Sequence, residues 1–294
     1  MKAAFLSDRG VVKVAGSEAR KFLNGLLTAD MGKVGPGRPA FAGLLTPQGK
    51  IIVDFIVAEA ADASFLFDCP RALAPALAER LAFYKLRAKL TIEDQSASLH
   101  VIAAWNDAAA AAAAPDLCFP DPRHAELGMR CISPHPPAEV AAALGATLVE
   151  ASAYERHRIM LGVPSGGLDF AYGDAFPHEA DMDQLNGIDF KKGCFVGQEV
   201  VSRMEHRGLA RTRVVPVALT GAAPVVGTAV TAGGKPVGVM GGAAGSRALA
   251  ALRLDRVEEA LAGGQHLRAG DAELKLVKPA WARFAFPGEP KAAE

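Results

Sequence analysis

The sequence has no long hydrophobic run and no excess of charge of either sign. No stretch of about 18 apolar residues is present, which argues against a membrane-spanning helix. No apolar segment of signal-peptide length precedes Asp8 and Arg9, and the short alanine run Ala108–Ala114 favours a helix or a linker. The 32 basic residues balance 32 acidic ones, so the chain is not built as a general nucleic-acid binder, although local basic patches are compatible with this balance. We therefore expect no direct membrane contact and no direct binding of nucleic acid.

Cysteine is scarce and lacks the spacing of metal or redox motifs. The chain has four cysteines, Cys69, Cys118, Cys131 and Cys194, and none forms a CxxC pair. A zinc ribbon or a thioredoxin-like site therefore has no local support. Without a signal peptide, we expect a reducing compartment and no disulfides.

The remaining composition is that of a folded protein with several domains. Half of the residues are hydrophobic, and 294 residues suit about two or three domains. Residues 48–148 alternate short apolar strands with helices, which predicts an α+β unit. Residues 212–286 contain short alternating runs, a hairpin turn at Gly233-Gly234 and one helix over Arg256–Ala262, which predicts a small, mostly β C-terminal domain.

The segment Lys191–Val200, KKGCFVGQEV, places a cysteine after two lysines. The thiolate is the reactive and ligating form of cysteine, and nearby cations or a helix N-terminus lower the pKa of the thiol. Lys191 and Lys192 supply positive charge, and a helix is expected to start just after Cys194. This environment favours a reactive or ligating thiol.

Three roles for Cys194 stay open on the residues alone. Gly193 and Gly197 allow the close approach of a ligand or a positive φ, which suits a thiol in a site. A small buried hydrophobe in a turn is the common role of a lone cysteine. A metal ligand would need help from His178 or His206, whose spacing matches no metal motif, so no built-in metal site is expected.

Two carboxylates stand out from their surroundings. Asp54 interrupts the apolar run Ile51–Val57, where a charge is costly unless it is paired. It lies either on the solvent face of an edge strand or in a cavity where it faces a ligand. Glu179 follows Pro177 in a turn-rich segment and is either a solvated loop acid or a second ligand-facing carboxylate.

A basic segment follows the cysteine motif. Five cationic or titratable side chains lie close together there: Arg203, His206, Arg207, Arg211 and Arg213. They form either a solvated helix end and domain linker or a site where convergent guanidinium groups capture an anionic tail.

The octapeptide Lys192–Glu199 resembles the K-G-C-[FY]-x-G-Q-E signature of YgfZ-type folate-binding proteins. These bacterial proteins are relatives of a mitochondrial iron–sulfur assembly factor and share the fold of the glycine-cleavage T-protein, an aminomethyltransferase. Further segments are similar to those of the family in the expected order: residues 22–30, 44–57, 155–164, 176–183 and 213–286. The resemblance therefore covers nearly the whole chain.

The resemblance implies an α+β, GcvT-like three-domain cloverleaf around a central folate channel, with a small C-terminal β-barrel domain. Its expected limits are a discontinuous folate-binding domain over 1–47 and 149–211, a second α+β domain over 48–148, the barrel over 212–286 and a tail over 287–294. The implied function is binding of tetrahydrofolate or a derivative, in support of the assembly or repair of iron–sulfur clusters. Clients would include radical enzymes that modify tRNA, and partners would be client enzymes or carrier proteins.

The resemblance also assigns roles to individual residues. Cys194 would be a reactive thiol or the ligand of a transient, shared iron–sulfur cluster. The rest of the signature is Lys192, Gly193, Gly197, Gln198 and Glu199. The expected folate contacts are Asp54, Glu179, Arg203 and Arg207. The location expected is the cytoplasm of a bacterium, or the mitochondrial matrix in a eukaryote.

One departure bears on catalysis. True aminomethyltransferases of this fold carry adjacent aspartates on the strand that matches Ile51–Val57, whereas this chain has Val53-Asp54. Two alternatives therefore stand beside the assembly role: an aminomethyltransferase of glycine cleavage, and a scaffold that binds clients without turnover. The sequence leaves open whether the protein is an enzyme.

Overall fold

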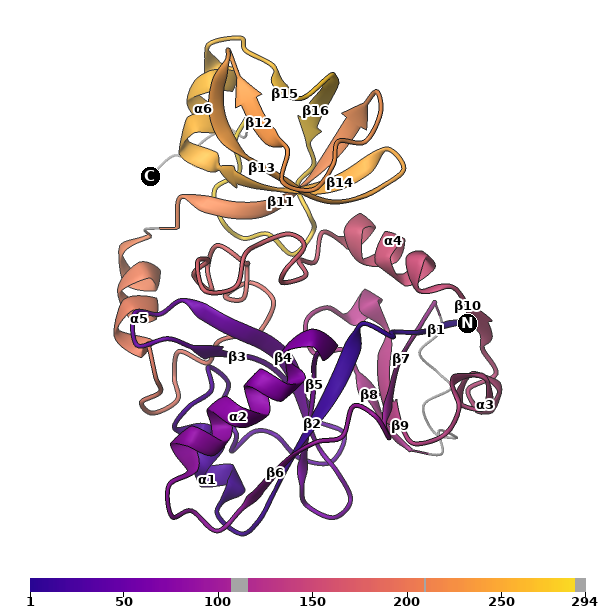
Figure 1. Cartoon of the computed structure of the whole chain (residues 1–294). Coiled ribbons are helices and arrows are strands. Elements are labelled where there is room, and N and C mark those ends of the chain that lie inside the picture. The colour runs from indigo at the N-terminus through magenta and orange to yellow at the C-terminus, as the bar shows by residue number, and fades with distance from the viewer. Residues whose placement is uncertain (107–115, 209, 289–294) are drawn as a thin grey trace. The chain divides into compact units, whose positions relative to one another are not determined.

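The computed structural model describes residues 1–106, 116–208 and 210–288, and it divides into two compact units. The first unit comprises Met1–Tyr154 and Leu185–Gln198, and the second comprises Glu155–Gln184 and Glu199–Glu294 (Figure 1). The alanine run Ala108–Ala114 and residues 289–294 of the expected tail lie outside the described residues.

The first unit contains an antiparallel sheet in the order β3-β4-β5-β2-β6. Its strands are β2 (Arg9–Ala15), β3 (Ala40–Leu45), β4 (Ile51–Glu59), β5 (Phe65–Pro70) and β6 (Thr91–Asp94). Helices α1 (Ala19–Asn24) and α2 (Ala74–Lys85) contribute to the same core, after the short 3-10 helix η1 (Arg71–Leu73). Phe55 and Phe67 pack there edge to face, 4.9 Å apart between ring centroids.

A second sheet of the same unit has the order β10-β1-β7-β9-β8. Its strands are β1 (Lys2–Phe5), β7 (His100–Trp105), β8 (Leu117–Pro120), β9 (Met129–Ser133) and β10 (Thr147–Val149). The 3-10 helix η3 (Ala125–Leu127) joins β8 to β9, and helix α3 (Pro137–Ala143) packs on β1 and β7. Strands β3 and β4 form one hairpin although they lie on opposite sides of the domain limit expected between residues 47 and 48. The expected domain limits as a whole stay a prediction.

The expectation that the chain holds no disulfide is wrong. Cys118 on β8 and Cys131 on β9 are joined by a disulfide. The antiparallel register places the two residues directly opposite each other, with 4.1 Å between their Cα atoms. Strand register of this kind is set by tertiary pairing, so spacing along the chain gave no sign of it. The free cysteines are Cys69, which is buried, and Cys194, which is exposed.

The second unit contains a closed six-stranded barrel in the order β11-β14-β13-β12-β15-β16. Its strands are β11 (Thr212–Thr220), β12 (Ala229–Ala232), β13 (Lys235–Ala244), β14 (Arg247–Arg253), β15 (Leu267–Ala269) and β16 (Ala272–Leu276). Helix α6 (Leu254–Ala262) packs on β13 and β14. The mostly β C-terminal domain is therefore confirmed, as is the hairpin turn at Gly233-Gly234, where both φ angles are positive.

Two further helices flank the long turn-rich segment that precedes the barrel: α4 (Ala151–Leu161) and α5 (Gln198–Arg207). Buried Arg158 of α4 pairs with Asp169 at 2.7 Å, and Asp169 accepts a hydrogen bond from the backbone N–H of Gly242 on β13. A Cβ atom at Gly241 would lie 2.4 Å from Asp169 Oδ1, so glycine lets this segment approach the barrel strand closely.

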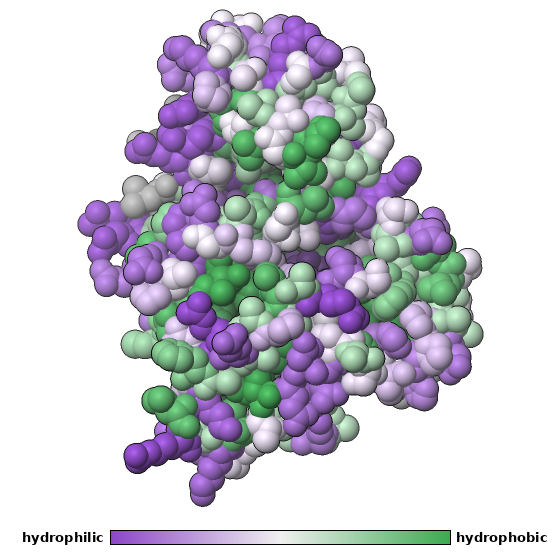
Figure 2. Space-filling model, in the orientation of Figure 1, coloured by the Kyte–Doolittle hydropathy of each residue, from purple (hydrophilic) through white to green (hydrophobic). Residues whose placement is uncertain are grey.

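The helices and one face of the surface can be compared with the hydrophobic pattern of the sequence. No helix in the described ranges is both long enough and apolar enough to cross a membrane. On the face drawn in Figure 2, hydrophobic residues form separate groups among hydrophilic ones.

Candidate functional site

The cysteine motif forms a loop in the first unit that is held by two buried side chains. Lys192 and Phe195 are each 8% exposed, whereas Gly193 and Cys194 between them are exposed. The Lys192 ammonium group lies 5.3 Å from the centroid of the Phe195 ring, a cation–π contact. The loop thus presents its thiol to solvent from a fixed base.

Lys192 is anchored by three backbone carbonyl groups. Its Nζ atom donates hydrogen bonds to the carbonyl oxygens of Asn24 at 2.7 Å, Leu27 at 2.6 Å and Ala29 at 2.7 Å. Asn24 ends α1, where helical carbonyls lack intrahelical partners. Burial lowers the pKa of Lys192 to about 8, against the attraction of the nearby Asp30 and Asp189 carboxylates. This lysine therefore fixes the loop to the end of α1.

The chain just before the motif is tied to the same region. The Thr28 hydroxyl group donates to the carbonyl of Gly187 at 2.6 Å and accepts from the N–H of Gly43 at 2.8 Å. Asp189 forms an ion pair with Lys33, and its N–H donates to the Thr28 carbonyl. Both side-chain and backbone contacts therefore hold residues 187–192 in place.

The two glycines of the motif differ in what they do. Gly197 has φ +82°, and a Cβ atom there would lie 2.7 Å from the Thr46 carbonyl oxygen and 3.1 Å from the Cα of Gly49. Gly197 therefore packs against the turn of the β3–β4 hairpin, and the predicted positive φ is confirmed. A Cβ atom at Gly193 would meet open space, so no steric demand explains that glycine.

The exposed thiol of Cys194 contrasts with that of Cys69. Cys69 lies within the sheet core, and burial raises the pKa of its thiol to about 12. A thiol with that pKa and no access to solvent is inert. Within residues 1–106, 116–208 and 210–288, Cys194 is thus the one free cysteine available to a partner or a cluster.

Asp54 is buried, so the solvent-face alternative is wrong. It is 6% exposed and lies on β4, an interior strand, opposite Gly43 of β3. Its carboxylate acts electrostatically on Arg9, which helps to offset the cost of burying a charge. Its role as a folate contact stays a prediction.

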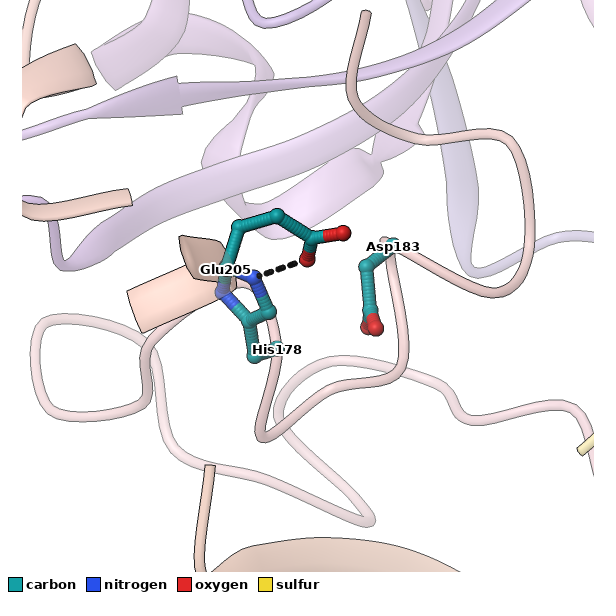
Figure 3. Close-up of side chains that lie close together, drawn as sticks. All are labelled: His178, Asp183 and Glu205. Atoms are coloured by element: carbon teal, nitrogen blue, oxygen red, sulfur yellow. Dashed lines mark hydrogen bonds and ion pairs between the residues drawn. The ribbon is translucent and has the colours of Figure 1, made fainter. Parts of the chain in front are cut away.

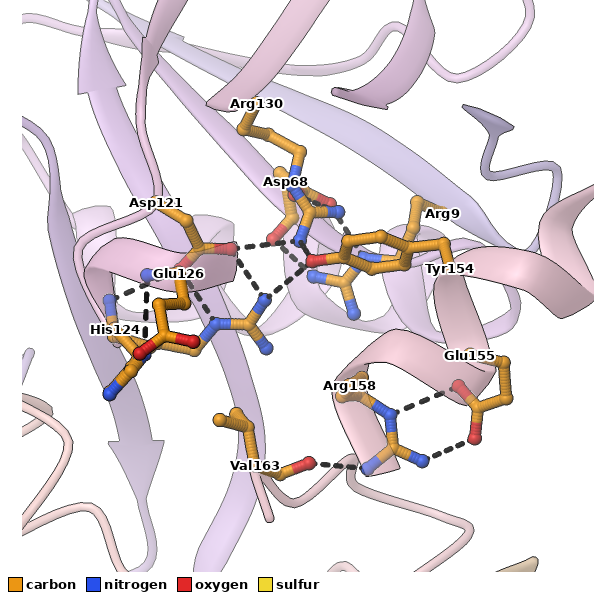
Figure 4. A network of polar contacts seen from close by, with 11 residues as sticks. Arg9, Asp68, Asp121, His124, Glu126, Arg130, Tyr154, Glu155, Arg158 and Val163 are labelled. Carbon is orange, nitrogen blue, oxygen red and sulfur yellow. Dashed lines mark hydrogen bonds and ion pairs between the residues drawn. The ribbon is translucent and has the colours of Figure 1, made fainter. Parts of the chain in front are cut away.

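Arg9 belongs to a buried ionic network that the sequence did not reveal (Figure 4). Arg9 binds Asp68 at 2.6 Å, and Arg130 lies 3.3 Å from Asp68 and 3.1 Å from Asp121. The Tyr154 hydroxyl group accepts a hydrogen bond from Arg130 at 3.0 Å. Because Asp68 is on β5 and Arg130 is on β9, this network joins the two sheets of the first unit.

The remaining predicted folate contacts belong to the second unit. Glu179 is half-buried and accepts a hydrogen bond from the N–H of Phe176 at 2.9 Å, which closes its own turn. Arg203 pairs along α5 with exposed Glu199, one turn away, at 2.7 Å. Arg207 is exposed at the end of α5, and Gln198 begins that helix, as expected from the motif.

The structure therefore gathers Lys192, Gly193, Cys194 and Gly197 in one loop and pairs Glu199 with Arg203. Asp54 shares the first unit with that loop, whereas Glu179, Arg203 and Arg207 are in the second. Sequence reasoning missed the carbonyl contacts of Lys192 and the network around Arg130. The one available signal was the presence of charged residues within apolar runs, as at Asp68 in FLFDCP.

Comparison with known proteins finds two family descriptions that each match part of the chain. Residues 6–111 match the family description of the GCVT N-terminal domain, and residues 211–284 match that of the CAF17 C-terminal beta-barrel domain. The crystal structure of the glycine cleavage system aminomethyltransferase T from Bartonella henselae superposes with a TM-score of 0.76 and covers 97% of this chain and 87% of that one. At 16% identity this likeness shows the fold, which is GcvT-like with a C-terminal barrel, as expected.

Sequence relatives narrow the family further. The chain is 36% identical over 231 residues to the iron–sulfur cluster assembly factor IBA57 homolog, mitochondrial, of Mycosarcoma maydis, covering 74% of this chain and 57% of that protein. It is 32% identical over 302 residues to the mitochondrial iron–sulfur cluster assembly factor IBA57 of Mus musculus, covering 92% of this chain and 82% of that protein. The match thus spans little more than half of the fungal relative but most of the mouse protein. Both relatives are named as the mitochondrial factor IBA57, which is itself a relative of the YgfZ-type proteins that the cysteine motif resembles. The chain therefore belongs to the family of IBA57 iron–sulfur cluster assembly factors.

Proposed function

We propose that this protein supports the assembly or repair of iron–sulfur clusters and that the Cys194 thiolate takes part directly. The observation that carries the proposal is the exposed thiol of Cys194 on a loop anchored by buried Lys192 and Phe195. The iron–sulfur cluster is inferred from the similarity to the IBA57 assembly factors. Clients that include radical enzymes acting on tRNA are part of the proposal.

Cys194 acts as one ligand among several. Protein-bound iron–sulfur clusters are held by about four cysteine thiolates. Cys69 is buried and Cys118 and Cys131 are joined, so Cys194 supplies one thiolate and the rest come from glutathione or a second chain. A cluster shared in this way is cargo in transit. An exposed, well-anchored thiol suits transfer, because the partner can reach it without rearrangement of the loop.

Tetrahydrofolate, or a derivative, is the proposed small-molecule ligand. The match to the GCVT N-terminal domain and the buried carboxylate of Asp54 support it. The amino-pyrimidinone edge of a pterin can be held by a carboxylate through two hydrogen bonds. The mitochondrial names of the relatives favour the mitochondrial matrix over the bacterial cytoplasm as the proposed location.

Replacement of Cys194 with Ser tests the central claim. In cells that lack their own copy of the protein, the variant should leave the activity of a [4Fe–4S] client enzyme at the level of cells with no copy. Cys69→Ala removes the other free cysteine and should restore activity like the wild type. Because Cys194 is exposed, the variant should keep the wild-type melting temperature. Full rescue by Cys194→Ser would refute a direct role of the thiol.

A calorimetric titration with tetrahydrofolate under anaerobic conditions tests the ligand. We expect one binding site per chain, with affinity at least tenfold weaker in Asp54→Asn, whose side chain keeps the shape but loses the charge. Lys191→Met, at an exposed position of the cysteine loop, is the control. Absence of heat with the wild-type protein would remove folate from the proposal and leave the cluster role intact.

A further inference from the structure

A histidine and two carboxylates converge in the second unit, away from the cysteine loop. His178 is 1% exposed, and its Nε2 atom lies 3.0 Å from Oε2 of Glu205 on α5. One ligand atom each from His178, Asp183 and Glu205 lie within 4.8 Å of one another. In Figure 3 the Glu205 carboxylate lies between the imidazole ring of His178 and the side chain of Asp183.

Arg213 on β11 holds this group from behind. Its two terminal nitrogens contact Asp183 at 2.5 and 3.0 Å, and Nη1 also donates to the His178 carbonyl at 2.8 Å. The guanidinium group thus orients the Asp183 carboxylate and fixes the backbone that carries His178. Oδ2 of Asp183 also accepts a hydrogen bond from Gln184 at 2.6 Å, whereas Oδ1 accepts one from Arg213 and keeps a second lone pair for another partner. Supporting contacts of this kind are typical around metal ligands.

Carboxylates outnumber guanidinium groups around the cavity beside this group, whose wall includes Asp183, Glu205, Asp255 and Glu258 but only Arg211 and Arg213. Asp181, with 0% exposure, lies 3.3 Å from the same Arg213, so one guanidinium group faces two carboxylates, and Glu205 adds a third beside His178. Within the described part of the chain, Oδ2 of Asp181 has no hydrogen-bond partner. Burial raises the pKa of Asp181 well above its usual range, so a bound proton can neutralise that carboxyl group, whereas Asp183 and Glu205 line the cavity. A divalent cation would be attracted by the Asp183 and Glu205 carboxylates on this wall.

The group opens onto a cavity of about 460 Å³ in the second unit. Its wall includes His178, Asp183 and Glu205, and Glu258 of α6 adds a further carboxylate. The cavity gives an ion a route of entry and leaves room for water on its open side. The side chain of Glu205 is 42% exposed, so it can move the short distance that coordination requires.

We propose that His178, Asp183 and Glu205 form a binding site for a divalent metal ion of the zinc class. One imidazole nitrogen and two carboxylate oxygens, with a water in the open position, form the donor set of an accessible zinc site rather than a closed structural one. Bonds of about 2.0–2.2 Å would replace the His178–Glu205 hydrogen bond. This departs from the expectation of no built-in metal site, because the partners of His178 are carboxylates that the fold brings together.

The test uses the full chain without a tag, treated with chelator and carrying Cys194→Ser so that the exposed thiol binds no metal. Calorimetric titration with Zn²⁺ at pH 7.5 should give one site per chain. Co²⁺ in its place should give visible absorption bands of a four- or five-coordinate ion. Glu205→Gln, at a side chain that is 42% exposed, should weaken Zn²⁺ binding at least tenfold and abolish the Co²⁺ bands.

Glu258→Gln is the matched control, because it removes an equal charge from the same cavity wall without touching the three ligands. It should change the affinity for Zn²⁺ less than threefold. Equal weakening by both variants would show diffuse attraction to an acidic wall and would overturn the site. Absence of one-to-one binding by the parent chain would overturn it as well, and the group would then be an ion-pair network.

Discussion

Replacing Arg130 with Met should lower the free energy of unfolding by about 2–3 kcal/mol, because two buried carboxylates and the Tyr154 hydroxyl group lose a charged partner that they share. Arg130 is 3% exposed and contacts both Asp68 and Asp121. Asp68 keeps its ion pair with Arg9 and Asp121 keeps its ion pair with Arg123, so the loss is that of the Arg130 contacts and not of an uncompensated charge. The same change removes an ionic contact between the two sheets of the first unit.

Urea denaturation of the purified protein measures this loss. Arg203→Met breaks an exposed pair on α5, whose Arg and Glu side chains are 54% and 84% exposed, and should cost no more than about 0.5 kcal/mol. A loss for Arg130→Met as small as that of the control would mean that water reaches the network and screens it.

The same network predicts a dependence on pH. Burial acts to raise the pKa of Asp121, but the guanidinium groups of Arg123 and Arg130 outweigh it and hold that pKa well below its usual range. A carboxylate with a lowered pKa contributes stability that is fully present above about pH 4 and is lost as the pH falls further. Arg130→Met should therefore show a smaller fall in unfolding free energy between pH 5 and 3 than the wild type.

Replacing Lys192 with Met should cost about 3–5 kcal/mol, because three carbonyl groups lose their shared hydrogen-bond donor at once. The methionine side chain keeps most of the length and apolar contact of the lysine stem. The carbonyls of Asn24, Leu27 and Ala29 would then have to be solvated or left unpaired. Loosening of the loop should also reduce cluster transfer, even though the Cys194 thiol is unchanged.

Lys191→Met is the matched control, since the adjacent lysine is exposed and its loss should change stability by less than about 0.5 kcal/mol.

The free energy of unfolding should also depend on pH through the protonation of Lys192. Its pKa is about 8 in the folded protein, against 10.5 for an ordinary lysine, so the folded protein releases this proton first. The contribution of Lys192 to stability should therefore rise between pH 8 and 10.5. Equal stability of the two variants would contradict the anchoring role.

Local patterns predicted much of this fold. The apolar run at Ile51 became β4, the turn at Gly233-Gly234 closed a hairpin, and the helix expected from Arg256 became α6, which begins two residues earlier at Leu254. The helix expected after Cys194 is also confirmed: it is α5, which begins at Gln198 within the cysteine motif. These features depend on residues close together in the chain, so periodicity and turn chemistry suffice to find them.

The contacts that define the candidate site join residues far apart. Lys192 was expected to activate its neighbour Cys194, but its ammonium group is bound to carbonyls near α1. Asp54 was open to two interpretations because its cation, Arg9, comes from another strand. Cys118 and Cys131 lie opposite each other because of the register in which β8 pairs with β9. Pairings of this kind follow from tertiary structure, and a single sequence carries no periodic signal for them.

The anchoring of Lys192 also sets an order of events during synthesis. The lysine lies 168 positions after Asn24, whose carbonyl it binds. At translation rates of about 5–20 residues per second, the end of α1 leaves the ribosome roughly 8–34 seconds before its lysine is made. During translation, the first unit cannot finish folding until its last segment, Leu185–Gln198, has left the ribosome. The cysteine loop is therefore among the last parts of that unit to form, and a truncated or stalled chain would not carry a properly presented thiol.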